Sequence, residues 1–170
     1  VIDGDIPVGA GLSSSAALES AAAFAVNELF QFGISKLDLV MIAQKAESKF
    51  AGVNCGVMDM FASIFGKKGF AIKLDCESLE YEYMPLVLNG SSLVLFNSNV
   101  KHTLASSAYN ERREQCEIGL NQIKQSDSNV NSFRDVTKDH LIRDVLPLGQ
   151  VIYDRCIYVV KEIERLNLAC

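Results

Sequence analysis

The chain has 170 residues, of which 49% are hydrophobic and 22% are charged, and its formal net charge at pH 7 is −5. These proportions are typical of a folded globular protein with one large domain or parts of two. An acidic chain without a basic stripe is not expected to bind nucleic acid, and no apolar run is long enough to span a membrane. The five cysteines have neither zinc-type nor redox-type spacing, so we expect reduced thiols and a cytoplasmic protein.

The spacing of apolar and turn-forming residues predicts strands and helices in the first half of the chain and helices in the second. A strand is expected at 1–6, helices at 13–30 and 36–50, a loop at 52–56, a short helix at 57–65, paired strands at 70–74 and 79–84, and an apolar strand at 93–97. Ser35 is expected to cap the second helix. Helices follow at 107–124 and 150–166, with Pro147 expected to start the last one. The change of character at 85–92 predicts a domain boundary there.

A glycine- and serine-rich loop at residues 7–15 leads directly into the first long helix. Gly9 and Gly11 have no Cβ, so the backbone can turn sharply and approach a ligand. The serines add hydroxyls and free N–H groups at the positive end of the helix dipole, which favours an anion such as a nucleotide phosphate. The alternative is that Gly11 and Ser13 only end a strand and cap a helix. The predicted phosphate cradle consists of Pro7, Gly9, Ala10, Gly11, Leu12, Ser13, Ser14, Ser15 and Ala16.

This loop resembles the second motif of the GHMP kinases, and two further segments are similar to the galactokinases within that family. They are residues 46–63, which contain Cys55-Gly56-Val57-Met58-Asp59, and residues 97–116, which contain Tyr109. The resemblance implies an α+β protein of the GHMP kinase fold. Residues 1–88 would be the later part of its N-terminal, ATP-binding domain, which is ribosomal protein S5 domain 2-like, and residues 89–170 would begin its α+β C-terminal domain. The first and last galactokinase motifs have no match, so we expect an internal piece of such a kinase.

The resemblance also implies a function, the phosphorylation of the anomeric hydroxyl of galactose by ATP and Mg²⁺ to give galactose 1-phosphate. Asp59 matches the catalytic aspartate and would contact the sugar together with Tyr109. Glu47 matches a carboxylate assigned to the metal, with Ser13 or Ser14 as the hydroxyl ligand and Ser14 preferred. The alternatives are a kinase for N-acetylgalactosamine or another sugar, and a catalytically silent sensor of galactose and ATP. The chain by itself is expected to be inactive and to expose apolar surface that favours self-association.

Each of these residues also has a structural interpretation. Asp59 could cap the short helix, Glu47 could be an exposed residue paired with a lysine, and Tyr109 could be an aromatic residue packed at a helix start. Met60 stands where the family usually has glutamine. It either changes how the aspartate is oriented or packs in the core in place of the glutamine. Cys55 is interpreted as a buried thiol and not as a nucleophile.

Overall fold

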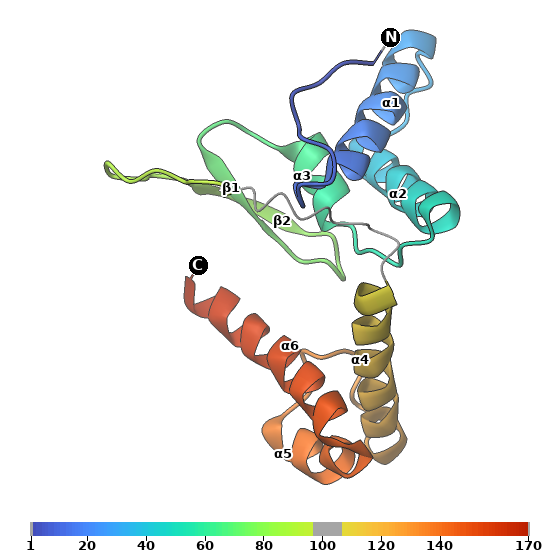
Figure 1. The fold of residues 1–170 in the computed structure, drawn as a ribbon, viewed down its shortest axis with the longest axis vertical. Helices are drawn as coiled ribbons and strands as arrows, with labels where there is room; N and C mark the ends of the chain where they lie inside the picture. Colours follow the sequence, from blue (N-terminus) through green and yellow to red (C-terminus); the bar gives the residue numbers. More distant parts are fainter. Residues whose placement is uncertain (1, 97–106, 170) are drawn as a thin grey trace. The chain divides into compact units, whose positions relative to one another are not determined.

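The structure is a computed structural model that describes residues 2–96 and 107–169. The chain divides into two compact units, Val1–Ser106 and Ser107–Cys170, and Figure 1 labels the elements of each. The boundary expected between residues 88 and 89 concerns the two domains that the resemblance implies and stays a prediction.

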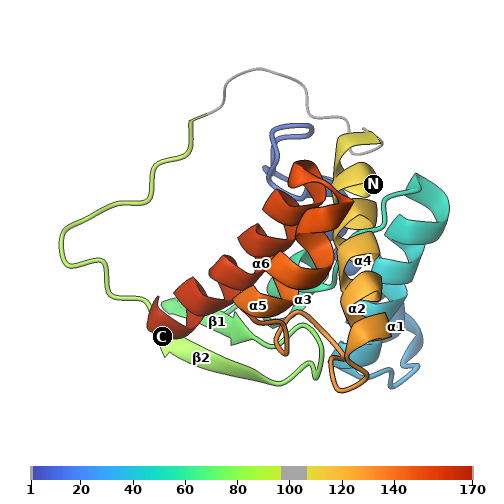
Figure 2. The same cartoon turned by 90° about the horizontal axis from the view of Figure 1, so that it is seen from below.

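Over residues 2–96, the first unit consists of three α-helices, one π-helix and a β-hairpin. Its elements are α1 (Ser14–Phe30), α2 (Lys36–Ala46), the π-helix η1 (Glu47–Ala51), α3 (Met58–Phe65), β1 (Phe70–Leu74) and β2 (Tyr81–Pro85). Helices α1 and α2 pack against each other, and both pack against α3. Figures 1 and 2 show α3 between this helix pair and the hairpin. The result is a layered α+β arrangement in which one side of α3 packs against α1 and α2 and the other side against the hairpin.

Aromatic side chains join α3 to the hairpin. Phe61 and Phe65 stack with ring centroids 4.3 Å apart, and Tyr81 of β2 packs edge-on against Phe61 at 5.2 Å. The Tyr83 hydroxyl donates a hydrogen bond of 2.6 Å to the Phe65 carbonyl oxygen. The strands are antiparallel, with Ile72 opposite Tyr83. These contacts fix α3, and with it the residues at its N-terminus.

Several local predictions for the first unit are confirmed. The three helices and the hairpin lie where the spacing placed them, and the Ser35 hydroxyl caps α2 by accepting a hydrogen bond from the Asp38 N–H at 3.1 Å. The strands expected at 1–6 and 93–97 are wrong over residues 2–6 and 93–96, which have no strand assignment. A strand is defined by hydrogen bonds to a neighbouring strand. Within the described residues, neither segment is paired in this way, so the apolar pattern alone did not suffice.

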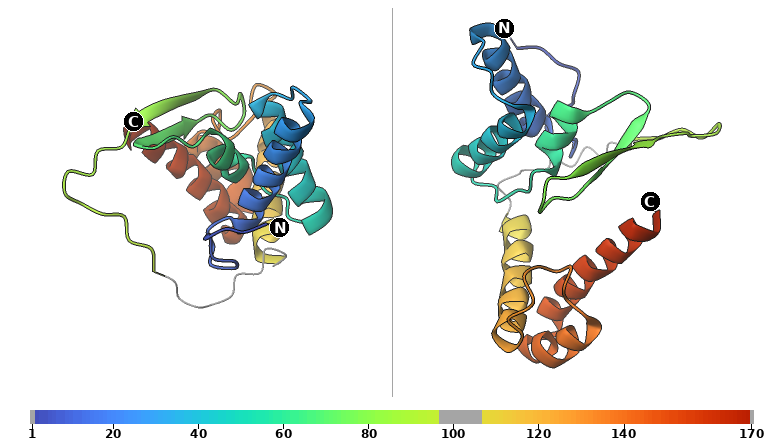
Figure 3. Two further views of the ribbon diagram at one scale, coloured as in Figure 1. Left: turned by 90° about the horizontal axis from the view of Figure 1, so that it is seen from above. Right: turned by 180° about the vertical axis from the view of Figure 1, so that it is seen from behind.

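The second unit is helical. Its elements are α4 (Ser107–Ser126), α5 (Lys138–His140), the π-helix η2 (Leu141–Val145), the 3₁₀ turn η3 (Leu146–Leu148) and α6 (Gln150–Ala169). Helices α4 and α6 pack against each other and against η2, around a core that includes Ile123, Leu141, Val145 and Cys156. Figure 3 shows the short helical segments joining one end of α4 to one end of α6. Pro147 does not start α6 but lies in η3, and Gly149 separates the two at a φ of 127°.

Many large apolar side chains are exposed in this chain. Phe96, Val8 and Leu29 are 92%, 91% and 75% exposed, respectively. Apolar surface of this extent is available for self-association, which stays a prediction. None of the helices within 2–96 and 107–169 combines the length and the apolar character that crossing a bilayer requires.

Candidate functional site

The loop before α1 has three residues with positive φ. Gly9, Gly11 and Ser13 have φ values of 75°, 74° and 53°. A Cβ built on either glycine would meet nothing within 4 Å, so the glycines serve the backbone conformation and not a close contact within the chain. The space beside this backbone is therefore open to a ligand.

Helix α1 begins without a side-chain cap. Ser13 is the N-cap residue, but its side chain makes no capping hydrogen bond, and the first turn contains no acidic residue. The N–H groups of a helix's first turn have no partner within the helix, and they form the positive end of its dipole. The interpretation of Ser13 as a capping side chain is therefore wrong, and the helix start is available to an anion.

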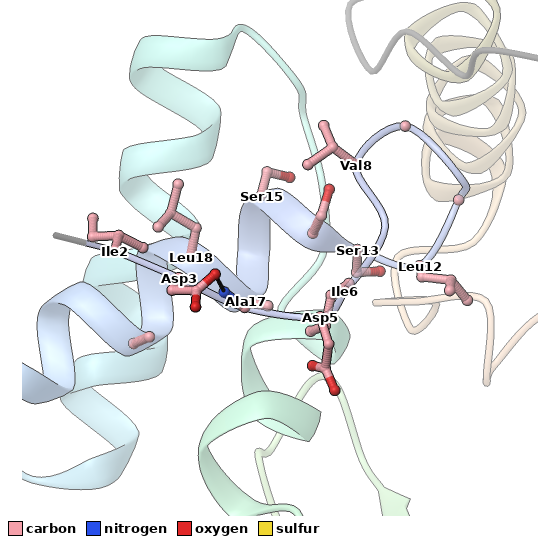
Figure 4. A pocket seen from close by; sticks show the side chains of 15 residues that line it. Ile2, Asp3, Asp5, Ile6, Val8, Leu12, Ser13, Ser15, Ala17 and Leu18 are labelled. Carbon is pink, nitrogen blue, oxygen red and sulfur yellow. Dashed lines mark hydrogen bonds between the residues drawn. The ribbon is translucent and has the colours of Figure 1, made fainter.

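An open cavity of about 710 Å³ lies beside this loop. Figure 4 shows that its wall is built from the loop, the first turns of α1 and the segment 2–6. The cradle residues Gly9, Gly11 and Ser13 line it, and so do Asp3 and Asp5. Two carboxylates on the wall repel a bare phosphate, so an anion held here is stable when a cation accompanies it.

A second, smaller cavity of about 40 Å³ brings several predicted residues together. Its lining residues come from the start of α1, from η1, from the loop that follows and from α3; they are Ser13, Ser15, Ala16, Glu47, Val53, Cys55, Asp59 and Met60. The predicted catalytic aspartate, the predicted metal carboxylate and two of the predicted cradle serines thus share one cavity. Segments far apart in the sequence therefore meet at one polar site in the first unit.

Glu47 is a buried carboxylate, with only 2% of its surface exposed. It begins the π-helix η1, a type of helix that is frequent at functional sites. The Ser15 hydroxyl donates a hydrogen bond of 3.2 Å to Glu47 Oε1, while Oε2 is buried and has no hydrogen-bond partner in the part of the chain that the structure describes. The interpretation of Glu47 as an exposed residue paired with a lysine is therefore wrong. A buried carboxylate oxygen without a partner is a candidate ligand for a cation.

Glu19 is a residue of this site that the sequence did not single out. It lies one helical turn after Ser15 on α1, close enough to Glu47 for the two carboxyl groups to interact. Burial, followed by the negative charge of Glu47 and the hydrogen bond that protonated Glu19 can donate to it, raises the pKa of Glu19 to about 7. The i, i+4 spacing of Ser15 and Glu19 places them on one face of the helix. This spacing was the only feature of the sequence that could have indicated Glu19, because nothing in the sequence showed that this face of α1 meets Glu47.

Asp59 is half-buried in the first turn of α3. The N-cap residue of that helix is Val57, and no side chain caps it. Asp59 therefore does not act as the helix cap, which was the structural alternative to a catalytic role. Its carboxylate is available to the small cavity that it lines.

Comparisons with known proteins agree with this arrangement. Residues 1–67 match the family model described as the GHMP kinases N terminal domain. The chain is 49% identical over 165 residues to a galactokinase of Thermotoga maritima, with 97% of this chain and 45% of the relative covered. It is 46% identical over 136 residues to a galactokinase of Clostridium beijerinckii, with 80% and 35% covered. A crystal structure of Lactococcus lactis galactokinase complexed with galactose matches 98% of this chain and 43% of its own, with a TM-score of 0.82 and 30% identity.

The chain is similar over nearly its whole length to the galactokinases, which are GHMP kinases. Its α+β architecture is that of the GHMP kinase fold, as the sequence predicted. The chain spans about 45% of the length of the Thermotoga relatives that it matches. GHMP kinases use ATP. The open cavity beside the glycine loop is therefore a candidate site for nucleotide phosphates.

Met60 and Cys55 lie near Asp59 and line the same small cavity. Met60, which replaces the usual family glutamine, is 1% exposed and packs in the core with Phe61 and Phe65. This favours the interpretation that methionine fills core volume. Burial and then the charge of Glu47 raise the pKa of the Cys55 thiol. A thiol that resists ionisation is a poor nucleophile, which favours the interpretation of Cys55 as a non-nucleophilic thiol, although its side chain is half-buried and not buried as expected.

The remaining predicted sugar contact, Tyr109, belongs to the second unit. Tyr109 lies in α4 of the second unit and is 48% exposed, so it is not packed away at the helix start. Its contact with a sugar stays a prediction. The rest of the resembling segment, residues 97–106, lies outside the described residues.

Proposed function

We propose that the protein containing this chain is a galactokinase, which transfers the terminal phosphate of ATP to the anomeric hydroxyl of galactose. The observation that carries the proposal is that Glu47 and Asp59 line one small cavity together with Ser13 and Ser15, at the start of α1. The choice of galactose is supported by relatives named galactokinase that are 49–50% identical over 97% of the chain.

The phosphates of ATP would be held by the loop and by the start of α1. Gly9 and Gly11 expose the backbone there, and the first turn of α1 offers N–H groups without a side-chain cap. Phosphoryl transfer needs little covalent chemistry from the protein, because catalysis consists mainly of positioning and of charge stabilisation. The loop supplies both through backbone groups that are already oriented.

The residues also fit a Mg²⁺ ion. Mg²⁺ prefers carboxylate and hydroxyl oxygens, and Glu47 has a buried oxygen without a partner in the described chain, with the Ser15 hydroxyl beside the other oxygen. When bound, Mg²⁺ would neutralise charge on the phosphates. Glu47 would hold it together with a serine hydroxyl of the loop. The contact with Glu47 supports Ser15 as that serine, whereas the sequence pointed to Ser14.

Asp59 would accept or orient the proton of the sugar hydroxyl. It is half-buried, lines the small cavity and does not cap its helix, so its carboxylate can face a substrate. Base catalysis of this kind contributes roughly a hundred- to ten-thousand-fold to the rate. Tyr109 would contact the sugar from the second unit.

The test is a coupled assay of ADP release by the full-length protein, with galactose, N-acetylgalactosamine, glucose and mannose as acceptors. We expect turnover with galactose, a fall of roughly a hundred- to ten-thousand-fold in Asp59→Asn, and no change in Glu82→Gln, which alters an exposed carboxylate of β2. ADP release with another sugar alone, or none despite MgATP binding, would instead indicate a different kinase or a sensor. An Asp59→Asn variant as active as the parent would remove Asp59 from the mechanism.

A second assay concerns the 170-residue chain by itself. We expect no turnover from it, because the first and last galactokinase motifs have no match in its sequence. Sustained ADP release that depends on galactose would contradict this expectation.

A further inference from the structure

We propose that Cys116 and Cys156 form a reversible oxidation site, in which a peroxide converts the two thiols into a disulfide between α4 and α6. The site lies in the second unit, contains none of the residues assigned to phosphoryl transfer, and does not depend on the proposed kinase activity. No spacing pattern in the sequence indicated this site, because the two cysteines are 40 residues apart.

The packing of α4 against α6 brings the two thiols together. Cys156 is fully buried and its Sγ lies 4.0 Å from the Cys116 carbonyl oxygen, and the two side chains share a hydrogen bond. One residue earlier on each helix, Arg155 Nε donates to Gln115 Oε1 at 3.3 Å, so the helices are in register at this level. Gly119, one turn further along α4, leaves room for the Cys156 sulfur, which a Cβ at that position would overlap.

The two thiols differ in acidity and in access. The hydrogen bond from Cys156, together with the positive charge of Arg155, lowers the pKa of Cys116 to about 7, against the opposing effects of burial and of Glu117. The same hydrogen bond and burial raise the pKa of Cys156. Cys116 is also half-buried, whereas Cys156 is fully buried. A thiolate is the reactive form of cysteine, so Cys116 is the attacking group and Cys156 is the resolving one.

The chemistry balances in two steps. The Cys116 thiolate attacks one oxygen of hydrogen peroxide, which breaks the O–O bond, gives a sulfenic acid and releases hydroxide. That hydroxide takes up the proton that Cys116 lost on ionising and becomes the first water. The Cys156 thiol then attacks the sulfenic sulfur and displaces its hydroxyl group, which takes the Cys156 proton and leaves as the second water. Overall, two thiols and one hydrogen peroxide give one disulfide and two waters, and a dithiol reductant reverses the change.

Trypsin separates every cysteine of the chain into its own peptide. Cys116 falls in residues 114–124 and Cys156 in residues 156–161, while Cys55, Cys76 and Cys170 fall in residues 50–67, 74–101 and 166–170. The test treats the whole chain with hydrogen peroxide, blocks remaining thiols with iodoacetamide, and digests without reductant before mass spectrometry. We expect a linked pair of peptides, 114–124 with 156–161, two hydrogen atoms lighter than their sum. It should disappear after treatment with dithiothreitol.

Two variants, and the outcomes that would overturn the proposal, make the test decisive. Cys116→Ser should abolish the linked pair, whereas Cys76→Ser, which changes an exposed cysteine, should leave it unchanged. The proposal is overturned if the parent chain shows Cys116 as a sulfinic acid or as the alkylated thiol while Cys156 stays unlinked. It is also overturned if Cys116 links instead to the peptide of another cysteine. Because the parent chain alone gives these outcomes, they do not depend on how a variant folds.

Discussion

The hydroxyl of Ser15 lies 3.2 Å from Oε1 of Glu47, although 32 positions separate the two residues in the sequence. The bond joins the first turn of α1 to the start of the π-helix η1. It therefore ties the glycine loop, which leads into α1, to the carboxylate that we propose for Mg²⁺. A buried carboxylate needs such a donor, since an ion without partners is costly in the interior.

Replacing Ser15 by alanine should destabilise the first unit. The change removes the hydroxyl that donates to Glu47 Oε1. Both buried carboxylate oxygens of Glu47 then lack a hydrogen bond from this serine, which costs about 1–3 kcal/mol. Urea unfolding should show this loss, together with weaker Mg²⁺-dependent binding of ATP. Ser14→Ala is the matched control, because the neighbouring hydroxyl is not the one that bonds Glu47, and it should unfold like the parent. Equal losses in the two variants would mean that the Ser15 bond has no special weight.

Glu19 should make the stability of the fold depend on pH. Its pKa is raised from 4.5 to about 7 in the folded chain, so between these values the folded state holds a proton that the unfolded state releases. The stabilisation is fully present below pH 4.5 and is lost as the pH rises through 7. Glu19→Gln keeps the size and a hydrogen-bond donor but removes the titration.

The measurement for Glu19 is urea unfolding of both chains between pH 4.5 and 8, without divalent cations. The free energy of unfolding of the parent should fall, relative to that of Glu19→Gln, as the pH rises across this range. The variant should therefore gain most at pH 8, where the parent has two negative charges at one site. A difference that is constant with pH would mean that the pKa of Glu19 is not raised in the folded chain.

Gly11→Ala should weaken the binding of MgATP. At a φ of 74°, an alanine costs about 1–2 kcal/mol, and each 1.4 kcal/mol is about tenfold in affinity, so a loss of roughly 5- to 30-fold is expected. Gly4→Ala is the control, because Gly4 lines the same cavity, has an ordinary φ and also has open space at its Cβ. Calorimetric titration of the full-length protein measures both. If both variants bind MgATP as tightly as the parent, the loop conformation is not required for the phosphate site.

The periodicity of the sequence predicted those elements whose stability is mostly local. Helices α1 and α6 and the strand β1 begin and end within a few residues of the expected positions. The segments 2–6 and 93–96 were wrong as strands because a strand also needs a partner, which the alternation of apolar residues does not reveal. The π-helix at Glu47–Ala51 was missed for a related reason, since its sequence reads as a continuation of α2.

The site was predicted as far as it resembles a family motif. Glu47 and Asp59 stood in such motifs and do share a cavity with the serines. Glu19 did not stand out, because its role depends on the face of α1 that meets Glu47, and that is settled only by the packing of α1 against η1. The cysteine pair of the second unit was hidden in the same way, since only the packing of α4 on α6 brings Cys116 and Cys156 together.

Gly119 should be intolerant of even one added methyl group. On an exposed helix, glycine to alanine stabilises by up to about 1 kcal/mol, but Gly119 is buried where α4 meets α6. A Cβ there would overlap the Cys156 sulfur and lie 3.3 Å from Val145 Cγ1 and 3.4 Å from Ile152 Cγ2. Overpacking of this kind costs about 1–3 kcal/mol, so the net effect of Gly119→Ala is destabilising.

The source of that cost can be separated by a double-mutant cycle on the free energy of unfolding. Cys156→Ala removes the sulfur that the new methyl group would overlap, while leaving a small cavity of its own. We therefore expect the double variant, Gly119→Ala with Cys156→Ala, to lose less free energy of unfolding than the two single variants lose together. The reason is that the methyl group added at Gly119 occupies the space that the Cys156 sulfur vacates. Strict additivity would show that the methyl group is accommodated by movement of α4 away from α6, and that the close approach of the two helices does not depend on Gly119.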